Sequence, residues 1–132
     1  MKLVDTGMGP SGKLTLQLIA MPKDTNANGD IYAGWLMEKM DLAGATAASN
    51  VSKGRTTTVA MERVEFLSPV VVGDQISCYT ELVDTGRSSI KILVEVYVID
   101  VISGQAKKVT ETTFIYVAIN EMGGIRQLPA TD

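Results

Sequence analysis

The order of apolar and polar residues predicts a strand, a long helix and then four further strands. A first strand is expected where Leu14, Leu16 and Leu18 alternate with polar residues. Residues 21–32 are rich in turn formers and show no period. From about Gly34 to Val51, apolar and small residues recur at helical spacing. The predicted buried face of this helix comprises Leu36, Met40, Ala43, Gly44, Ala47 and Val51.

The second half of the chain is rich in Val, Ile, Thr and Tyr, which favour strands. Strands are predicted at 55–67, 74–83, 87–101 and 107–119, and their short connections require antiparallel neighbours. The economical arrangement is an α+β fold with one helix covering one face of a curved antiparallel sheet. The small residues in the lower half of the helix indicate that something packs closely there. The other face of the sheet carries Leu93, Tyr97 and Ile99, so we expect an oligomer that covers them.

Composition narrows the possible chemistry. The chain has 132 residues, no histidine and one cysteine, Cys78. It therefore lacks a Ser-His-Asp triad, a Cys-His dyad and a histidine zinc site, and it has no intrachain disulfide. A carboxylate becomes the leading candidate for proton transfer. The net charge of −3 argues against nucleic acid as a partner, and no apolar run is long enough to span a bilayer. We expect a cytoplasmic protein without membrane insertion.

Three segments match known motifs without their structural context. Residues 7–12 have the GxGxxG spacing, but the dinucleotide fingerprint needs a preceding strand and a following helix. We predict a flexible N-terminal arm over 1–12 instead, followed by one domain over 13–129. Residues 24–29 match half of a calcium loop, but the position that requires a bidentate glutamate is Trp35. Residues 50–52 form a glycosylation sequon, which has no meaning without export. We therefore expect no metal and no cofactor.

The junction between the loop and the helix is a candidate site. The amides of Ala33 and Gly34 lie near the predicted helix start, where unpaired N–H groups can polarise a carbonyl oxygen. Small residues that simply form the turn are an equally good explanation. Asp41 lies within the helix, where aspartate is unfavourable. From the residues alone, solvent exposure or pairing with a cation is favoured over catalysis for this side chain.

The helix length limits how these groups can cooperate. Asp41 follows Gly34 by seven positions, which is about 10 Å of helix. A general base must come within about 3 Å of its target, or act through one water. If the helix start and Asp41 are both catalytic, they must therefore come from different subunits across a two-fold interface.

Several segments together resemble one family. The segment Ala20–Met37 followed by Met40 and Asp41, the segments 66–70 and 72–74, the residues Gly86-Arg87-Ser88-Ser89-Ile90 and the C-terminal Arg126-Gln127-Leu128-Pro129 match in order and spacing. With these residues the chain resembles the hotdog-fold acyl-CoA thioesterases of the YciA type, from about residue 13 to 129. The resemblance implies a long central helix wrapped by an antiparallel sheet, dimers with composite active sites and usually a trimer of dimers.

The resemblance also implies site residues. The catalytic aspartate of the family corresponds to Asp41, the polar loop residue to Asn26, and the helix-start amide to Ala33 or Gly34. The region that meets the nucleotide and phosphates of coenzyme A corresponds to Arg87, Ser88 and Ser89. The family commonly has Gly-Gly before the tryptophan, whereas this chain has Ala33 at the first position, which puts a Cβ where the thioester approaches.

The function expected from the resemblance is hydrolysis of acyl-CoA to the free acid and coenzyme A. The helix-start amides would hold the thioester oxygen, Asn26 would place the carbonyl or the water, and Asp41 of the facing subunit would act as general base or as nucleophile. Arg87 would bind a phosphate, unless it is an ordinary surface charge at a hairpin. The alternative from another class is a hotdog module that binds acyl-CoA without turnover. Acyl-chain preference and the choice between tetramer and hexamer stay open.

Overall fold

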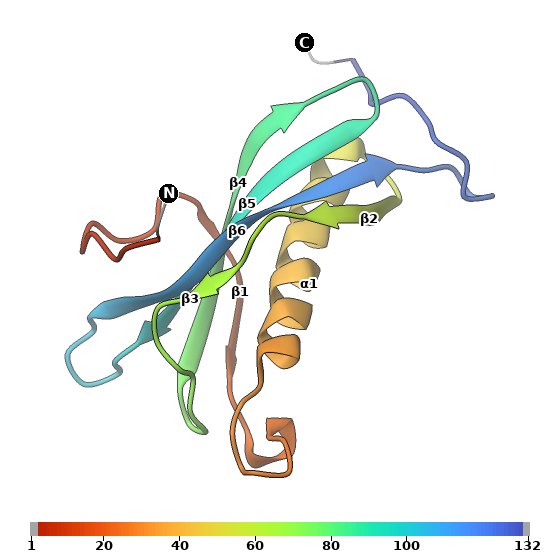
Figure 1. The fold of residues 1–132 in the computed structure, drawn as a ribbon. Helices are drawn as coiled ribbons and strands as arrows, with labels where there is room; N and C mark the ends of the chain where they lie inside the picture. Colours follow the sequence, from red (N-terminus) through yellow and green to blue (C-terminus); the bar gives the residue numbers. More distant parts are fainter. Residues whose placement is uncertain (1–2, 131–132) are drawn as a thin grey trace.

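The computed structural model describes residues 3–130, which form one long helix and a six-stranded sheet (Figure 1). The elements are β1 (Lys13–Ile19), the short 3-10 helix η1 (Pro22–Asp24), α1 (Ala33–Ser52), β2 (Thr56–Met61), β3 (Glu65–Phe66), β4 (Gln75–Thr85), β5 (Ser89–Ile99) and β6 (Ala106–Ala118). The sheet has the order β1-β4-β5-β6-β2, with β3 also paired to β6, and each pair is antiparallel. The predicted α+β hotdog architecture is confirmed.

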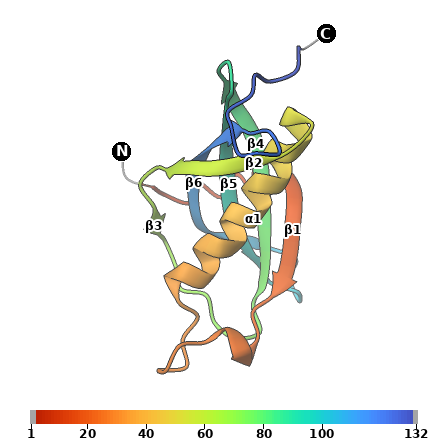
Figure 2. The same cartoon turned by 90° about the vertical axis from the view of Figure 1, so that its right-hand side faces the viewer.

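The helix packs against one face of the bent sheet, and the core lies between them (Figures 1 and 2). The predicted buried face is slightly rotated in the structure. Trp35 and Ala48 are buried in addition to Leu36 and Met40, whereas Ala47 and Val51 are only half-buried. Gly44, Ala48 and Ser52 are four positions apart and share one face, and the sheet covers this line of the helix in place of the one through Ala47 and Val51.

The long predicted strand over 55–67 is interrupted in the structure. β2 and β3 pair with different parts of β6, and residues 62–64 between them leave the regular ladder. The hydroxyl of Thr112 donates to the carbonyl oxygens of Glu62 and Arg63, at 3.0 and 3.2 Å. These side-chain bonds replace ladder bonds, so the segment can bend without leaving its carbonyl groups unpaired.

The outer face of the sheet is partly covered by the N-terminal segment, which lies on the side away from α1 (Figure 1). The amides of Ser11 and Gly12 donate to the carboxylate of Glu95 on β5, at 3.0 and 3.2 Å. Tyr97, on the same strand, is only 2% exposed. The prediction that Tyr97 is exposed in a monomer is therefore wrong, because the side chain is buried within a single chain. Burial also raises the pKa of Tyr97 to about 12.

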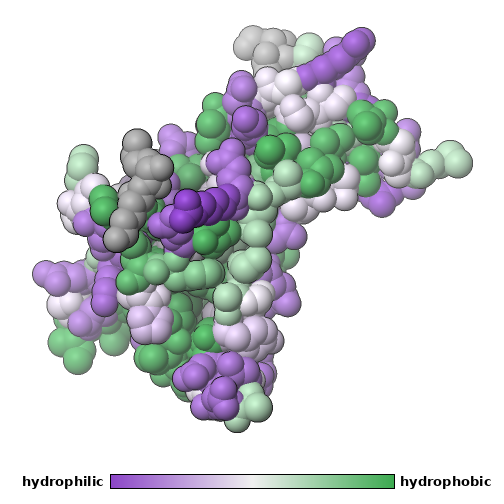
Figure 3. Space-filling model, in the orientation of Figure 1, coloured by the Kyte–Doolittle hydropathy of each residue, from purple (hydrophilic) through white to green (hydrophobic). Residues whose placement is uncertain are grey.

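Apolar residues nevertheless reach the surface in patches, several of them at the upper right of the molecule in Figure 3. On the helix side they include Leu42 on α1 and Val59 on β2, which are 53% and 54% exposed. None of the helices described between residues 3 and 130 is both long enough and apolar enough to cross a membrane.

Candidate active site

Two side chains, the carboxylate of Asp24 and the amide of Asn26, hold the loop before α1 by hydrogen bonds. Asp24, at the end of η1, accepts a hydrogen bond from the amide of Met21 at 2.9 Å and one from the Lys23 ammonium at 3.0 Å. These bonds lower the pKa of Asp24 below its ordinary value, and the bond from the Met21 amide has the largest effect. The side-chain oxygen of Asn26 accepts from the amides of Asn28 and Asp30, at 2.9 and 3.1 Å. The loop is thus closed on itself before the helix begins.

The first turn of α1 offers main-chain donors. Tyr32 is the N-cap residue and gives no side-chain capping bond. Within residues 3–130, no described hydrogen bond uses the amide of Ala33 or Gly34, as is usual for the first residues of a helix. Both residues are exposed, and a Cβ added to Gly34 would make only ordinary contacts, at 3.5 Å, with the ring of Tyr32. The chain itself therefore does not require glycine at position 34.

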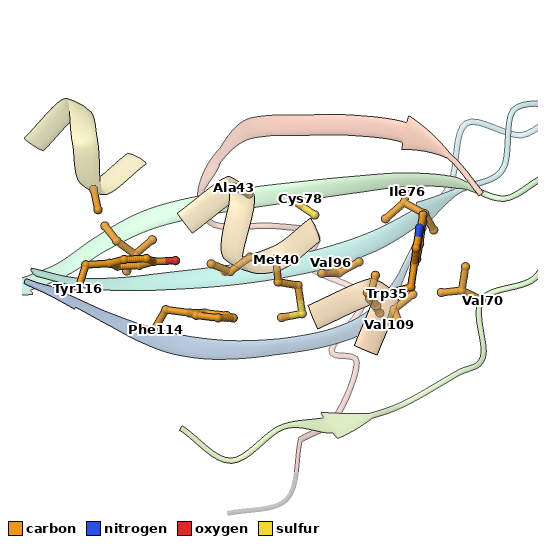
Figure 4. Close-up of a cluster of buried hydrophobic side chains, with 14 of the residues drawn as sticks. Trp35, Met40, Ala43, Val70, Ile76, Cys78, Val96, Val109, Phe114 and Tyr116 are labelled. Carbon is orange, nitrogen blue, oxygen red and sulfur yellow. The ribbon is translucent and has the colours of Figure 1, made fainter. Parts of the chain in front are cut away.

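Asp41 lies two turns further along α1, where it is half-buried. Its Oδ1 atom accepts one hydrogen bond from the hydroxyl of Thr58 on β2, at 2.7 Å, and another from the hydroxyl of Tyr116 on β6, at 3.0 Å. Figure 4 shows Tyr116 in the core with its hydroxyl directed toward α1. Burial and the neighbouring Asp41 carboxylate raise the pKa of Tyr116 far above its ordinary value. The Tyr116 hydroxyl therefore keeps its proton and can donate a hydrogen bond to Asp41.

Gly34 and Asp41 line the same open hollow. It has a volume of about 410 Å³, and its other lining residues are Met37, Glu38, Thr58, Val59, Ala60, Met61 and Phe114. Ala33 faces a second hollow of about 340 Å³, which is lined mainly by apolar residues such as Leu36, Phe66 and Val70. A helix start with free amides and a hydrogen-bonded carboxylate therefore border one surface depression. The free amides can polarise a carbonyl group and the carboxylate can accept a proton from water, but about 10 Å of helix separates these groups within one chain.

The other predicted site residues lie elsewhere in the chain. Asn26 is exposed in the loop that precedes the first turn of α1. Arg87, Ser88 and Ser89 lie at the hairpin between β4 and β5, near the opposite end of the helix (Figures 1 and 2). That helix has 20 residues, so its ends are about 30 Å apart. One chain alone does not bring Asn26 and Arg87 together.

The hairpin is well anchored, but the side chain of Arg87 is exposed. The carbonyl oxygen of Arg87 accepts from the amide of Leu128, and that of Ser88 accepts from the amide of Ala118, both at 2.9 Å. In the part of the chain that the structure describes, the Arg87 guanidinium takes part in no ion pair. A fixed backbone with an unneutralised cation is suited to binding an anionic group.

Sequence reasoning missed Thr58 and Tyr116. Threonine and tyrosine are ordinary strand residues, so nothing in their local pattern indicates that they converge on Asp41. The one available signal was Gly44, because the small residues of α1 predicted a close approach. A Cβ at Gly44 would lie 2.1 Å from the Tyr116 hydroxyl. Across residues 3–130, no cluster of three Cys, Asp or Glu side chains is arranged to hold a metal ion.

Known proteins resemble the chain over almost its whole length. Residues 28–103 match the thioesterase superfamily. The acyl-CoA thioester hydrolase YciA of Salmonella typhimurium is 50% identical over 123 residues, which cover 91% of this chain and 92% of the relative. A hexameric broad-specificity acyl-coenzyme A thioesterase has a similar structure, with a TM-score of 0.90 and 44% identity over 98% of this chain and 90% of that one.

A mutant of that thioesterase, in which an aspartate is replaced by alanine, has also been solved. It is similar to this chain with a TM-score of 0.87 and 45% identity, over 92% of this chain and 90% of that one. The resemblance inferred from the sequence is confirmed by these similarities.

Proposed function

The chain belongs to the thioesterase superfamily and is an acyl-CoA thioester hydrolase of the YciA type, and from this premise we propose that Asp41 activates the attacking water. The observation that carries the proposal is the pairing of the Asp41 carboxylate with Thr58 and Tyr116 at the edge of an open hollow. Both described donors use Oδ1, which leaves Oδ2 available for a water. A related enzyme in which an aspartate was replaced is in keeping with this role.

The helix start would stabilise the charge that develops during hydrolysis. As water attacks the thioester carbon, Asp41 takes the water's proton and the carbonyl oxygen becomes an oxyanion. The amides of Ala33 and Gly34 would donate to that oxygen, assisted by the positive end of the helix dipole. When the tetrahedral intermediate collapses, the C–S bond breaks and the departing thiolate takes the proton back from Asp41. The products are the free acid and coenzyme A with a free thiol.

Two subunits would share each site. Asp41 and Gly34 of one helix are separated by about 10 Å, too far for both to contact one reacting carbon. Val59, an exposed apolar residue that lines the hollow, and the exposed Leu42 of α1 support a partner subunit on this side of the molecule. The related thioesterase is hexameric, and we propose a hexamer here as well. Each active site would then combine the helix start of one subunit with Asp41 of the facing one.

Two further groups would bind and orient the substrate. The side-chain oxygen of Asn26 is used within its own loop, so its NH₂ group is the part available to orient the thioester carbonyl or the water. Arg87 would bind a phosphate of coenzyme A, with Ser88 and Ser89 adding hydrogen bonds. Because Asn26 and Arg87 lie near opposite ends of α1, a bound substrate would contact them on different subunits.

The variant Asp41→Asn tests the central step. Asparagine keeps the shape of the side chain and an oxygen that accepts from Thr58 and Tyr116, but it cannot take a proton from water. We expect thiol release from a panel of acyl-CoA substrates to fall by about 10²–10⁴-fold, with the circular dichroism spectrum unchanged. Glu121→Gln removes an exposed carboxylate far from α1 in sequence and serves as the matched control. A folded Asp41→Asn protein with the wild-type rate would refute the proposal.

Direct attack by Asp41 on the thioester is the alternative route, with a mixed anhydride as intermediate. It predicts a burst of coenzyme A within the first turnover, while the acyl group stays attached to Asp41. Rapid quenching followed by mass spectrometry of the intact protein distinguishes the two routes. With water as the nucleophile, coenzyme A and free acid form together, and no acylated protein accumulates.

A further inference from the structure

The buried hydroxyl of Tyr116 holds Asp41 at two points. It donates toward the carboxylate oxygen Oδ1 at 3.0 Å and lies 3.1 Å from the main-chain oxygen of the same residue. We propose that Tyr116 is a positioning residue for the Asp41 carboxylate. Gly44 has no side chain and therefore lets the Tyr116 hydroxyl approach the helix. The proposal rests on the role of Asp41 proposed above.

Gly44 leaves the space that the tyrosine occupies. A Cβ at this position would lie 2.1 Å from the Tyr116 hydroxyl oxygen and 3.0 Å from the ring carbon that bears it. Both atoms belong to a fully buried side chain, so the ring has little room to retreat. Glycine inside a helix costs stability relative to alanine, so its presence here has to be explained by packing. Gly44 is three positions after Asp41, on the adjacent turn of the same face.

The two donors to Asp41 differ in how firmly they are held. Tyr116 is 0% exposed, and its ring stacks on Phe114 with 6.1 Å between the ring centroids. Thr58 is exposed, so its hydroxyl can exchange Asp41 for water. The pKa of Tyr116 is raised by burial and by Asp41, which keeps the hydroxyl a donor over the working pH range. Tyr116 therefore fixes the direction of the carboxylate, and Thr58 donates a second hydrogen bond to it.

The test compares Tyr116→Phe with Tyr97→Phe. The first variant removes the hydroxyl that contacts Asp41, and the second removes a hydroxyl from an equally buried tyrosine on the outer face of the sheet. For Tyr116→Phe we expect kcat to fall by about 10- to 100-fold, the range for a lost hydrogen bond to a charged group, with KM unchanged. Tyr97→Phe should retain the wild-type kcat. Both are assayed well below their melting temperatures.

The pH profile supplies a readout that mere loss of stability would not change. A carboxylate that loses a donor binds a proton more readily, so the acid limb of the kcat profile should move to higher pH in Tyr116→Phe. Among residues 3–130, the titratable groups recorded beside Asp41 are Glu38, which lies one turn earlier on α1 and lines the hollow, and Tyr116 on β6, while β2 contributes the non-ionising Thr58. A wild-type kcat and an unshifted acid limb would overturn the proposal.

Gly44→Ala provides an independent second test. Its Cβ should displace Tyr116 and lower both the melting temperature and kcat. In the double variant Gly44→Ala/Tyr116→Phe, removal of the hydroxyl relieves the 2.1 Å clash but leaves the ring carbon at 3.0 Å, so the melting temperature should recover in part, while kcat stays at the Tyr116→Phe level. Fully additive losses in kcat would contradict a shared mechanism. Failure of the proposed function is recognised separately, because only then does Asp41→Asn keep the wild-type rate.

Discussion

Thr58 and Tyr116 lie directly opposite each other on β2 and β6, and their hydroxyls converge on one oxygen of Asp41. The ladder becomes irregular immediately afterwards, where Ala60 rather than Val59 pairs with Ile115. Such bulges re-aim side chains and are frequent beside active sites. The two strands therefore act together as a support for a carboxylate that belongs to a third element, the helix.

Gly34→Ala should separate activity from stability. The added Cβ meets only the ring of Tyr32, at 3.5 Å, and alanine is the better helix former, so the melting temperature should stay the same or rise slightly. If the thioester approaches this turn, kcat/KM should fall by about 10-fold or more because the methyl group lies in its path. The reverse change at the preceding position, Ala33→Gly, should instead preserve or increase activity toward bulky acyl groups. Equal activity of Gly34→Ala and the wild type would contradict this use of the helix start.

Arg87→Ala should weaken binding of the nucleotide part of the substrate. The Arg87 side chain is exposed and has no described ion pair between residues 3 and 130, so the fold should not depend on it. KM for acyl-CoA should rise by about 10-fold, as expected for one charge-assisted hydrogen bond. The same acyl group on N-acetylcysteamine, which carries no phosphate, should be hydrolysed as by the wild type.

Arg63→Ala is the control for Arg87→Ala. It removes an exposed arginine that pairs with Glu65 at 2.9 Å, away from the β4–β5 hairpin. Its KM for acyl-CoA should match that of the wild type. An equal rise in KM for both variants would indicate a general effect of net charge and not a phosphate contact at the hairpin.

Arg126→Ala should destabilise the C-terminal end of α1. The guanidinium donates to the main-chain oxygens of Ile119, Ser52 and Arg55, at 2.9, 3.0 and 3.2 Å. Loss of these bonds should lower the free energy of unfolding by about 2–3 kcal/mol. Urea denaturation at one fixed protein concentration measures the change, since subunit association also affects the midpoint. Arg126→Lys, which keeps the charge but lacks the planar fork, should recover only part of the loss.

Cys78 should be unreactive in the native protein. It is fully buried, and desolvation raises the pKa of its thiol to about 12, so the reactive thiolate is scarce at pH 8. A thiol reagent should label it only after unfolding in denaturant. Because the folded state keeps the thiol protonated, its contribution to stability is present below pH 9 and is lost as the pH rises from about 9 toward 12. Rapid labelling of the folded protein would contradict this environment.

Much of the fold could be predicted from local patterns. The 3.6-residue period predicted both ends of α1 to within about one residue, and the short connections required antiparallel strands. The break between β2 and β3 could not be predicted, because it depends on hydrogen bonds donated by Thr112, about 50 residues away. The covering of Tyr97 was missed for the same reason, since the segment around Ser11 reaches β5 only in three dimensions.

The sequence by itself determined which chemistry was possible. Without histidine, a carboxylate became the leading candidate for proton transfer, and the resemblance selected Asp41. Only the tertiary structure decided what holds that carboxylate. Thr58 and Tyr116 are 17 and 75 positions away from it, and neither residue type signals a functional role when it occurs in a strand. Their contact exists because β2 and β6 pair in register and because Gly44 leaves room at the helix surface, a complementarity that no local period encodes.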